Sequence, residues 1–165
     1  MSLKLHNIDP VYSSDSKILI LGSFPSVKSR EAQFFYAHPQ NRFWKVLTAL
    51  YAPDGGIELD TVDKKRDFLL KNKIAVWDVI RSCEITGSSD SSIKNVKVND
   101  IEMILSAADI KAIFSNGATS YNLYMKYCAD KLGRPSVKLP STSPANAAYS
   151  LERLIDAWSA IKDYC

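Results

Sequence analysis

The chain has 165 residues, 46% of them hydrophobic, which fits one domain with a sizeable core and excludes an intrinsically disordered chain. Its 21 basic and 18 acidic residues give a formal net charge of +3, which permits contact with nucleic acid without requiring it. Because the sequence has no bilayer-length apolar run, no signal core and three cysteines without CxxC spacing, we expect a single domain over residues 1–165 of a cytoplasmic protein, with no membrane segment and no four-thiolate metal site.

Short apolar runs bounded by turn residues predict four buried strands, at 17–22, 74–79, 110–115 and 136–139. Apolar residues at helical spacing predict helices over 43–51, 101–108 (capped by Asn99), 118–132 (ending at Gly133) and 151–161 (capped by Ser150). Segments 52–56 and 86–92 are rich in Gly, Ser and Asp and predict loops. Buried strands that alternate with helices predict an α/β fold, in which a parallel sheet is covered on both faces.

In such a sheet, ligands bind at the carboxyl ends of the strands, so the chemistry is expected in the loops at 22–26, 78–80, 116–117 and 140–144. The first loop has neither GxGxxG nor GxxxxGK[ST], so no nucleotide cofactor is predicted. It is not GxSxG either, and a serine hydrolase built on Ser23 would have to recruit His38 across the fold. The sequence has no HExxH motif, so no catalytic zinc is predicted.

The segment at 34–44 is dense in aromatic and polar side chains and has two interpretations. In the first, Asn41 caps the following helix while Phe43 and Trp44 pack inside. In the second, Tyr36 offers a ring face on which a base can stack, and Asn41 offers an amide that donates and accepts. His38 is either a turn residue or a neighbour of the base, and the sequence does not separate these alternatives.

The loop at 140–144 also has two interpretations. Ser143-Pro144 has the composition of a helix cap followed by proline at the first helical position. The free N–H groups of that helix start and the hydroxyls of Ser141, Thr142 and Ser143 would then hold a phosphate. A plain helix cap is the alternative.

Together, five motifs in order resemble the uracil-DNA glycosylase superfamily, most closely its hypoxanthine-DNA (deoxyinosine) glycosylase branch: GSFPSVKS (22–29), FYAHPQNRFW (35–44), WDVIRSCEITGSSDSSI (77–93), FSNG (114–117) and STSPANA (141–147). The second motif also resembles the mismatch-specific uracil glycosylases, in which the aromatic residue before AHP, here Tyr36, stacks on the flipped base. The resemblance implies a three-layer α/β/α fold around a four-stranded, mainly parallel sheet, and excision of a damaged base without metal or cofactor.

Three positions depart from the superfamily's pattern. Phe24 stands where a polar residue usually positions the attacking water, so we assign that role to Asn41, with Ser23 as the second candidate. Ser141 replaces the histidine that stabilises the departing base in the classical uracil enzymes. Ala145 is small for the residue that wedges into the vacated base stack, and Asn146 is the candidate to fill that gap.

Asp78 stands where the classical uracil enzymes place a base-reading asparagine. A carboxylate only accepts hydrogen bonds, which suits the N1–H of hypoxanthine and not adenine, which has no hydrogen on N1. The alternative is a carboxylate that caps a loop or pairs with Arg81.

The sequence therefore predicts a monofunctional, monomeric DNA glycosylase that acts on DNA containing deaminated bases and prefers hypoxanthine to uracil. A non-catalytic nucleic-acid-binding domain on the same fold is the alternative, because Phe24 and Ser141 replace the two best-known catalytic groups. The remaining assignments form two sets. The base-binding set is Gly22, Phe24, Tyr36, Asp78 and Asn116, and the DNA-binding set is Ser26, Ser141, Thr142, Ser143 and Asn146.

Overall fold

A computed structural model describes residues 3–165 and contains a four-stranded parallel sheet at its centre. Each strand of this sheet pairs in parallel with its neighbour, in the order β3-β2-β6-β7. The strands are β2 (Ile18–Gly22), β3 (Ile74–Asp78), β6 (Ala112–Asn116) and β7 (Val137–Leu139). All of β2 and β3 is buried, which explains why their sequences are continuous apolar runs without alternation.

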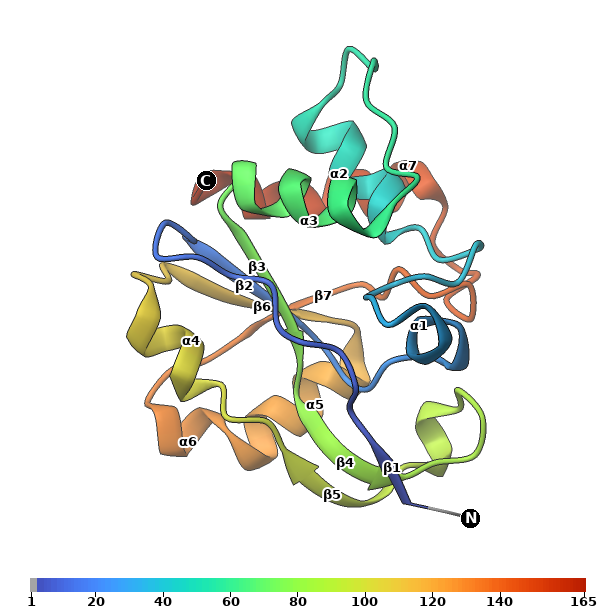
Figure 1. The fold of residues 1–165 in the computed structure, drawn as a ribbon, viewed down its shortest axis with the longest axis vertical. Coiled ribbons are helices and arrows are strands. Elements are labelled where there is room, and N and C mark those ends of the chain that lie inside the picture. The colour runs from blue at the N-terminus through green and yellow to red at the C-terminus, as the bar shows by residue number, and fades with distance from the viewer. Residues whose placement is uncertain (1–2) are drawn as a thin grey trace.

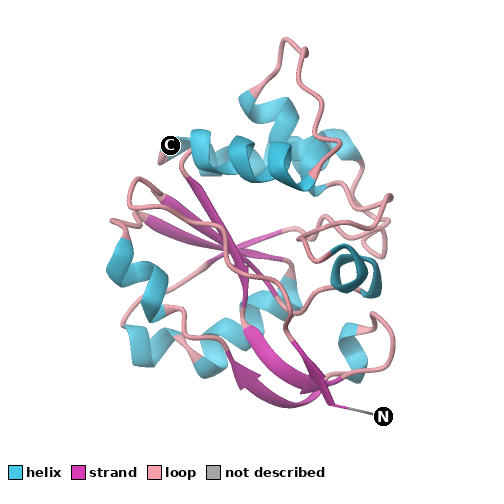
Figure 2. Ribbon diagram, viewed as in Figure 1, coloured by secondary structure: helices cyan, strands magenta, loops and turns pink. Residues whose placement is uncertain are grey.

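Helices cover both faces of this sheet (Figures 1 and 2). One face carries α2 (Phe43–Tyr51), α3 (Val62–Lys71) and α7 (Leu151–Trp158), the last continued by a 3₁₀ turn, Ser159–Asp163. The other face carries α4 (Glu102–Ala107), α5 (Ala118–Tyr127) and α6 (Ala129–Leu132). The predicted α/β class and the three-layer arrangement are confirmed.

Two details of the predicted helices were wrong. The helix predicted over 118–132 is broken at Cys128 into α5 and α6, although it ends at Gly133 in the left-handed conformation as expected. Asn99 does not cap α4. Its amide instead donates to the carbonyls of Asp78 (2.9 Å) and Ile80 (3.1 Å). Buried carbonyls without a donor would cost free energy, whereas water can satisfy N–H groups at a helix start that lacks a side-chain cap.

A second, three-stranded antiparallel sheet was not predicted at all. It consists of β1 (Leu3–Leu5), β4 (Ile80–Glu84) and β5 (Lys94–Val98), in the order β1-β4-β5. The predicted loop at 78–80 is in fact a near-continuous strand, since only Val79 separates β3 from β4. The Val79 and Ile80 N–H groups are held by the carbonyls of Gly22 and Ser23, at 2.9 and 3.1 Å.

Two helices were also missed. The short α1 (Val27–Ala32) begins at Ser26, whose hydroxyl accepts from the Ser29 N–H, and α3 is mostly polar and buries only Phe68 and Leu69. Neither shows the broad apolar face that predicted the other helices.

No helix within residues 3–165 is both long enough and apolar enough to cross a membrane.

Asn99 gives a stability prediction that separates its observed role from that of a cap. Aspartate caps helices as well as asparagine does, so Asn99→Asp would be nearly neutral at a cap. Here it would place a buried carboxylate against two carbonyls, and we expect the free energy of unfolding to fall by at least about 2 kcal/mol in urea denaturation. Exposed Asn122 on α5 provides the control, and Asn122→Asp should change the stability little.

Candidate active site

A cavity of about 350 Å³ opens where the strands of the parallel sheet end. Its volume lies in the range of small-molecule sites, and its walls come from loops that are far apart in the sequence. It collects all of the residues assigned from the sequence except Asn146. Its lining is Gly22, Ser23, Phe24, Pro25, Ser26, Ser29, Phe35, Tyr36, His38, Asn41, Asp78, Ser88, Asp90, Asn116, Ser141, Thr142, Ser143, Pro144 and Ala145.

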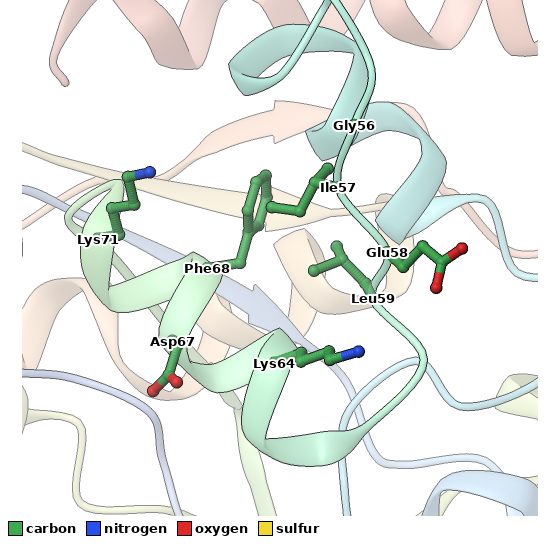
Figure 3. A pocket seen from close by; sticks show the side chains of 8 residues that line it. All are labelled: Gly56, Ile57, Glu58, Leu59, Lys64, Asp67, Phe68 and Lys71. Carbon is green, nitrogen blue, oxygen red and sulfur yellow. The ribbon is translucent and has the colours of Figure 1, made fainter.

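A larger cavity of about 850 Å³ lies elsewhere, between the segment 56–59 and α3 (Figure 3). Ile57, Leu59 and Phe68 give it an apolar floor, and its charged groups are Glu58, Lys64, Asp67 and Lys71. None of the residues assigned from the sequence lines it, and it lies away from the carboxyl ends of the strands. The smaller cavity is therefore the candidate site.

Three polar side chains from three separate loops form a hydrogen-bonded chain in the site. The Thr142 hydroxyl donates to Asn41 Oδ1 (2.8 Å) and accepts from Asn116 Nδ2 (3.0 Å), while the Thr142 N–H donates to Asn116 Oδ1 (3.0 Å). Asn41 Oδ1 also accepts from the Phe43 N–H at 2.9 Å, in the turn that leads into α2. Both acceptor positions of Asn41 Oδ1 are thus occupied, so the group that Asn41 leaves for a ligand or water is its Nδ2 donor.

Thr142 therefore does not fit its predicted role at a phosphate. The residue is fully buried, and its only hydroxyl proton is already donated to Asn41. A phosphate oxygen accepts hydrogen bonds, so it would need that same proton. The structure places Thr142 as the link between Asn41 and Asn116.

Tyr36 lies over α2 with one ring face covered. Its ring stacks on Phe43, with a centroid separation of 4.0 Å, and its backbone adopts the left-handed conformation (φ 52°) that side chains rarely take. The Tyr36 carbonyl holds this conformation by accepting from Trp44 Nε1 at 3.1 Å. Only the ring face away from Phe43 is left for the predicted stacking on a base.

The Tyr36 hydroxyl is a second feature of the site, which the sequence did not indicate. It is buried and has no hydrogen-bond partner within residues 3–165. Burial raises the pKa of this hydroxyl far above its ordinary value and the negative charge of Asp78 raises it further, while the neighbouring Asn116 amide, which lies outside good hydrogen-bond geometry, offsets part of the rise. The hydroxyl therefore keeps its proton and is a donor without an acceptor.

Asp78, at the end of β3, is buried beside this hydroxyl. Its backbone lies opposite Gly22 in the sheet, and a Cβ on Gly22 would come within 2.3 Å of Asp78 Oδ1 and 3.0 Å of the Tyr36 hydroxyl. Asp78 Oδ2 accepts from His6 Nε2 at 2.8 Å. The alternative pairing with Arg81 is not observed, since Arg81 is exposed and the carboxylate pairs with His6 instead.

A partly buried arginine, Arg42, joins the loop before α2 to the loop after β7. Its guanidinium donates to the carbonyls of Ser143 (3.1 Å), Asn146 (3.0 Å) and Tyr149. The backbone N–H of Arg42 donates to the Thr142 carbonyl at 3.0 Å. These bonds fix the position of one wall of the site relative to the other.

The loop at 141–146 forms that wall, and it differs from the prediction. Ser143 Oγ accepts from the Ala145 N–H (3.1 Å) as a cap would, but no helix follows: the chain makes two successive turns before α7 begins behind the Ser150 cap. Arg42 binds the Ser143 and Asn146 carbonyls, which in a helix would accept from backbone N–H groups one turn further on. Asn146 donates to the Ser141 carbonyl (3.0 Å), so its amide braces the loop rather than projecting as a wedge.

The remaining predicted residues lie at the rim or in the wall. Ser23 Oγ donates to Asp90 (3.3 Å), and no hydrogen bond joins Ser23 to a histidine in the part of the chain that the structure describes. Ser26 caps α1, and His38 Nδ1 accepts from the Gln40 N–H in a turn. Phe24 is buried against Ile80, Cys83 and Ile85, which explains its apolar character.

Sequence reasoning missed His6 and Arg42. No local motif indicates either of them, because each acts through a partner more than 70 residues away. The one available signal for His6 was that the chain has only two histidines, which makes each of them a candidate functional residue. Within residues 3–165, no group of three or more His, Cys, Asp or Glu side chains could hold a metal ion.

Comparisons with known proteins agree with this geometry. Two relatives are named hypoxanthine DNA glycosylase: one from Methanosarcina acetivorans is 31% identical over 92% of this chain and 93% of its own, and one from Methanosarcina barkeri is 30% identical over 72% and 74%. A solution NMR structure from Methanosarcina acetivorans, named as a candidate uracil DNA glycosylase, has a TM-score of 0.79 and 30% identity, with 97% and 96% of the chains covered. The model of the uracil DNA glycosylase superfamily matches residues 10–162, and the chain belongs to that superfamily.

Proposed function

We propose that this protein is a DNA glycosylase that hydrolyses the N-glycosidic bond of hypoxanthine, and less readily of uracil, in DNA. The observation that carries the proposal is the pairing of a buried acceptor, Asp78 Oδ1, with a buried and unpartnered donor, the Tyr36 hydroxyl, beside Gly22. The names of the two Methanosarcina relatives support the same substrate.

This donor and acceptor match what deamination changes in a base. Deamination of adenine or cytosine turns a ring nitrogen from an acceptor into an N–H donor and places a carbonyl next to it. Asp78 Oδ1 would accept from that N–H, and the Tyr36 hydroxyl would donate to the adjacent carbonyl. Adenine would leave Asp78 facing a lone pair, and buried polar groups left unpaired in this way give strong discrimination.

Bond cleavage then requires support for the departing base and a placed water. The sugar becomes cationic while negative charge collects on the base, so donors at the base lower the barrier. The Tyr36 hydroxyl is one such donor. Asn41 Nδ2 would hold the attacking water by its oxygen, which suffices because a cationic sugar needs the water to be placed more than deprotonated.

The rim of the site would face the DNA backbone. Ser141 and Ser143 are partly exposed at the mouth of the cavity, next to exposed Pro144 and Ala145. Hydroxyls of this kind bind phosphates without reading sequence. That residues 1–165 form a single domain that acts as a monomer in the cytoplasm stays a prediction.

The direct test is single-turnover incubation with labelled duplexes that contain one inosine or one uracil, without added metal, followed by alkali. We expect strand cleavage at inosine and weaker cleavage at uracil, because only a glycosylase leaves an alkali-labile abasic site. Binding of the duplexes by folded protein without cleavage of either would instead favour the non-catalytic alternative.

Asn41→Ala should lower the single-turnover rate on inosine by about 100-fold or more, as expected when the group that places a reactant is lost. Thr142→Val keeps the shape of the side chain but removes one of the two hydrogen bonds that hold Asn41 Oδ1, so it should cost about tenfold, the value of that one bond. Asn122→Ala on the exposed face of α5 is the matched control. Full activity of folded Asn41→Ala would remove Asn41 from the mechanism.

Asp78→Asn should change which bases are cut. His6 needs an acceptor, so the new amide would turn its oxygen to His6 and its NH₂ toward the base, where it would face the N1–H of hypoxanthine donor to donor. We expect hypoxanthine excision to fall by about 100-fold, within the discrimination that unpaired polar groups allow. The ratio of adenine to hypoxanthine excision should rise, and an unchanged ratio would contradict the role of Asp78.

A further inference from the structure

His6 reaches the site from the N-terminal segment and is held there by backbone bonds. It follows β1, and its N–H donates to the Arg81 carbonyl at 2.8 Å. Its ring is enclosed by the rings of Phe24, Phe35 and Trp77, and only 3% of its side chain is exposed. The ring therefore cannot turn freely.

The hydrogen bonds also assign the proton of this ring. Nδ1 accepts from the Ile8 N–H at 3.3 Å, so in the neutral ring the proton lies on Nε2. Nε2 then donates to Asp78 Oδ2 at 2.8 Å. One of the two carboxylate oxygens of Asp78 is thereby bound from behind the site, since His6 does not line the cavity.

The other oxygen, Oδ1, is not bound by His6. It lies against Gly22 on the side of the Tyr36 hydroxyl, and Gly22, Tyr36 and Asp78 all line the cavity. The carboxylate consequently presents a single acceptor oxygen to a base, although a free carboxylate has two.

A single acceptor oxygen separates hypoxanthine from guanine, a distinction that acceptor chemistry alone does not make. Guanine has the same N1–H and the same carbonyl as hypoxanthine and differs by one amino group on C2. A free carboxylate binds two neighbouring N–H groups in the two-pronged way in which it binds arginine, so it would bind the N1–H and the amine of guanine together. A carboxylate with one oxygen held by His6 matches only the N1–H.

We propose that His6 is a positioning residue that makes Asp78 a one-oxygen acceptor and so excludes guanine from the site. The proposal rests on the glycosylase function proposed above. Guanine entering this site would bury its amine without an acceptor, and such a mismatch costs more than the absence of a contact. His6 would thus protect the normal base that most resembles the substrate.

The experiment compares release of free hypoxanthine and free guanine by chromatography from two duplexes, in which inosine or guanine lies opposite thymine. Both are mispairs, so the cost of removing the base from the stack is similar. Wild type should release hypoxanthine in large excess over guanine, with the incubation long enough for the slow release of guanine to be measured. His6→Leu removes the donor and should lower the ratio of hypoxanthine to guanine release by about tenfold or more, the effect of relieving one buried mismatch.

His6→Gln is the rescue variant, because its amide can donate to Asp78 from nearly the same place, and it should keep the wild-type ratio. Leu5→Ala, on the exposed face of β1, controls for disturbance of the strand itself. An unchanged ratio in folded His6→Leu, or equal ratios in the Leu and Gln variants, would overturn the proposal while leaving the glycosylase function intact. Failure of wild type to release hypoxanthine would instead overturn the function.

A measurement on the wild-type protein covers the case in which His6→Leu does not fold. The ¹⁵N chemical shifts of the His6 ring should show the proton on Nε2 and none on Nδ1. A ring with its proton on Nδ1 could not donate to Asp78 and would contradict the proposal.

Discussion

The site depends on the close approach of Gly22 to the carboxylate of Asp78. The parallel register of β2 and β3 sets these residues side by side, and a single methyl group on Gly22 would occupy the space of Asp78 Oδ1. That methyl group would also crowd the Tyr36 hydroxyl, which lies close to Gly22 as well. Only glycine therefore leaves room for a buried acceptor and a buried donor beside each other at the end of the sheet, and the base-reading chemistry proposed for the cavity follows from that arrangement.

Around this point, the walls of the cavity are held by side chains that bind other loops. Thr142 joins Asn41 to Asn116, and Arg42 binds carbonyls of the loop that follows β7. Loops are the more mobile parts of a fold, and a reactant misplaced by 1 Å loses most of its rate advantage. The polar network gives these loops the fixed geometry that placing a water at a sugar carbon requires.

The antiparallel sheet supplies the remaining constraint. Its strands β1 and β4 bring His6 against Asp78, from a part of the chain 72 residues away. The sheet was invisible in the sequence because β1 has only three residues, all exposed, and because β4 follows β3 with a single residue between them. A strand that changes sheets without a turn carries no Gly or Pro signal at the junction.

The sequence by itself determined the α/β class, the four buried strands, most of the helices and the set of loops that meet at the site, because apolar periodicity and strand direction are local properties. It also indicated Asn41, Tyr36 and Asp78 through their chemistry and through the resemblance of their motifs. Only the tertiary structure decided that Thr142 is a link, that Asn146 braces a loop, that the Tyr36 hydroxyl lacks an acceptor among the described residues and that His6 binds Asp78. The partners of Thr142 and His6 are distant in the chain, and even the short-range bond of Asn146 to Ser141 depends on how the loop folds, because a hydrogen bond is decided by where two groups meet in space rather than by the residues on either side of them.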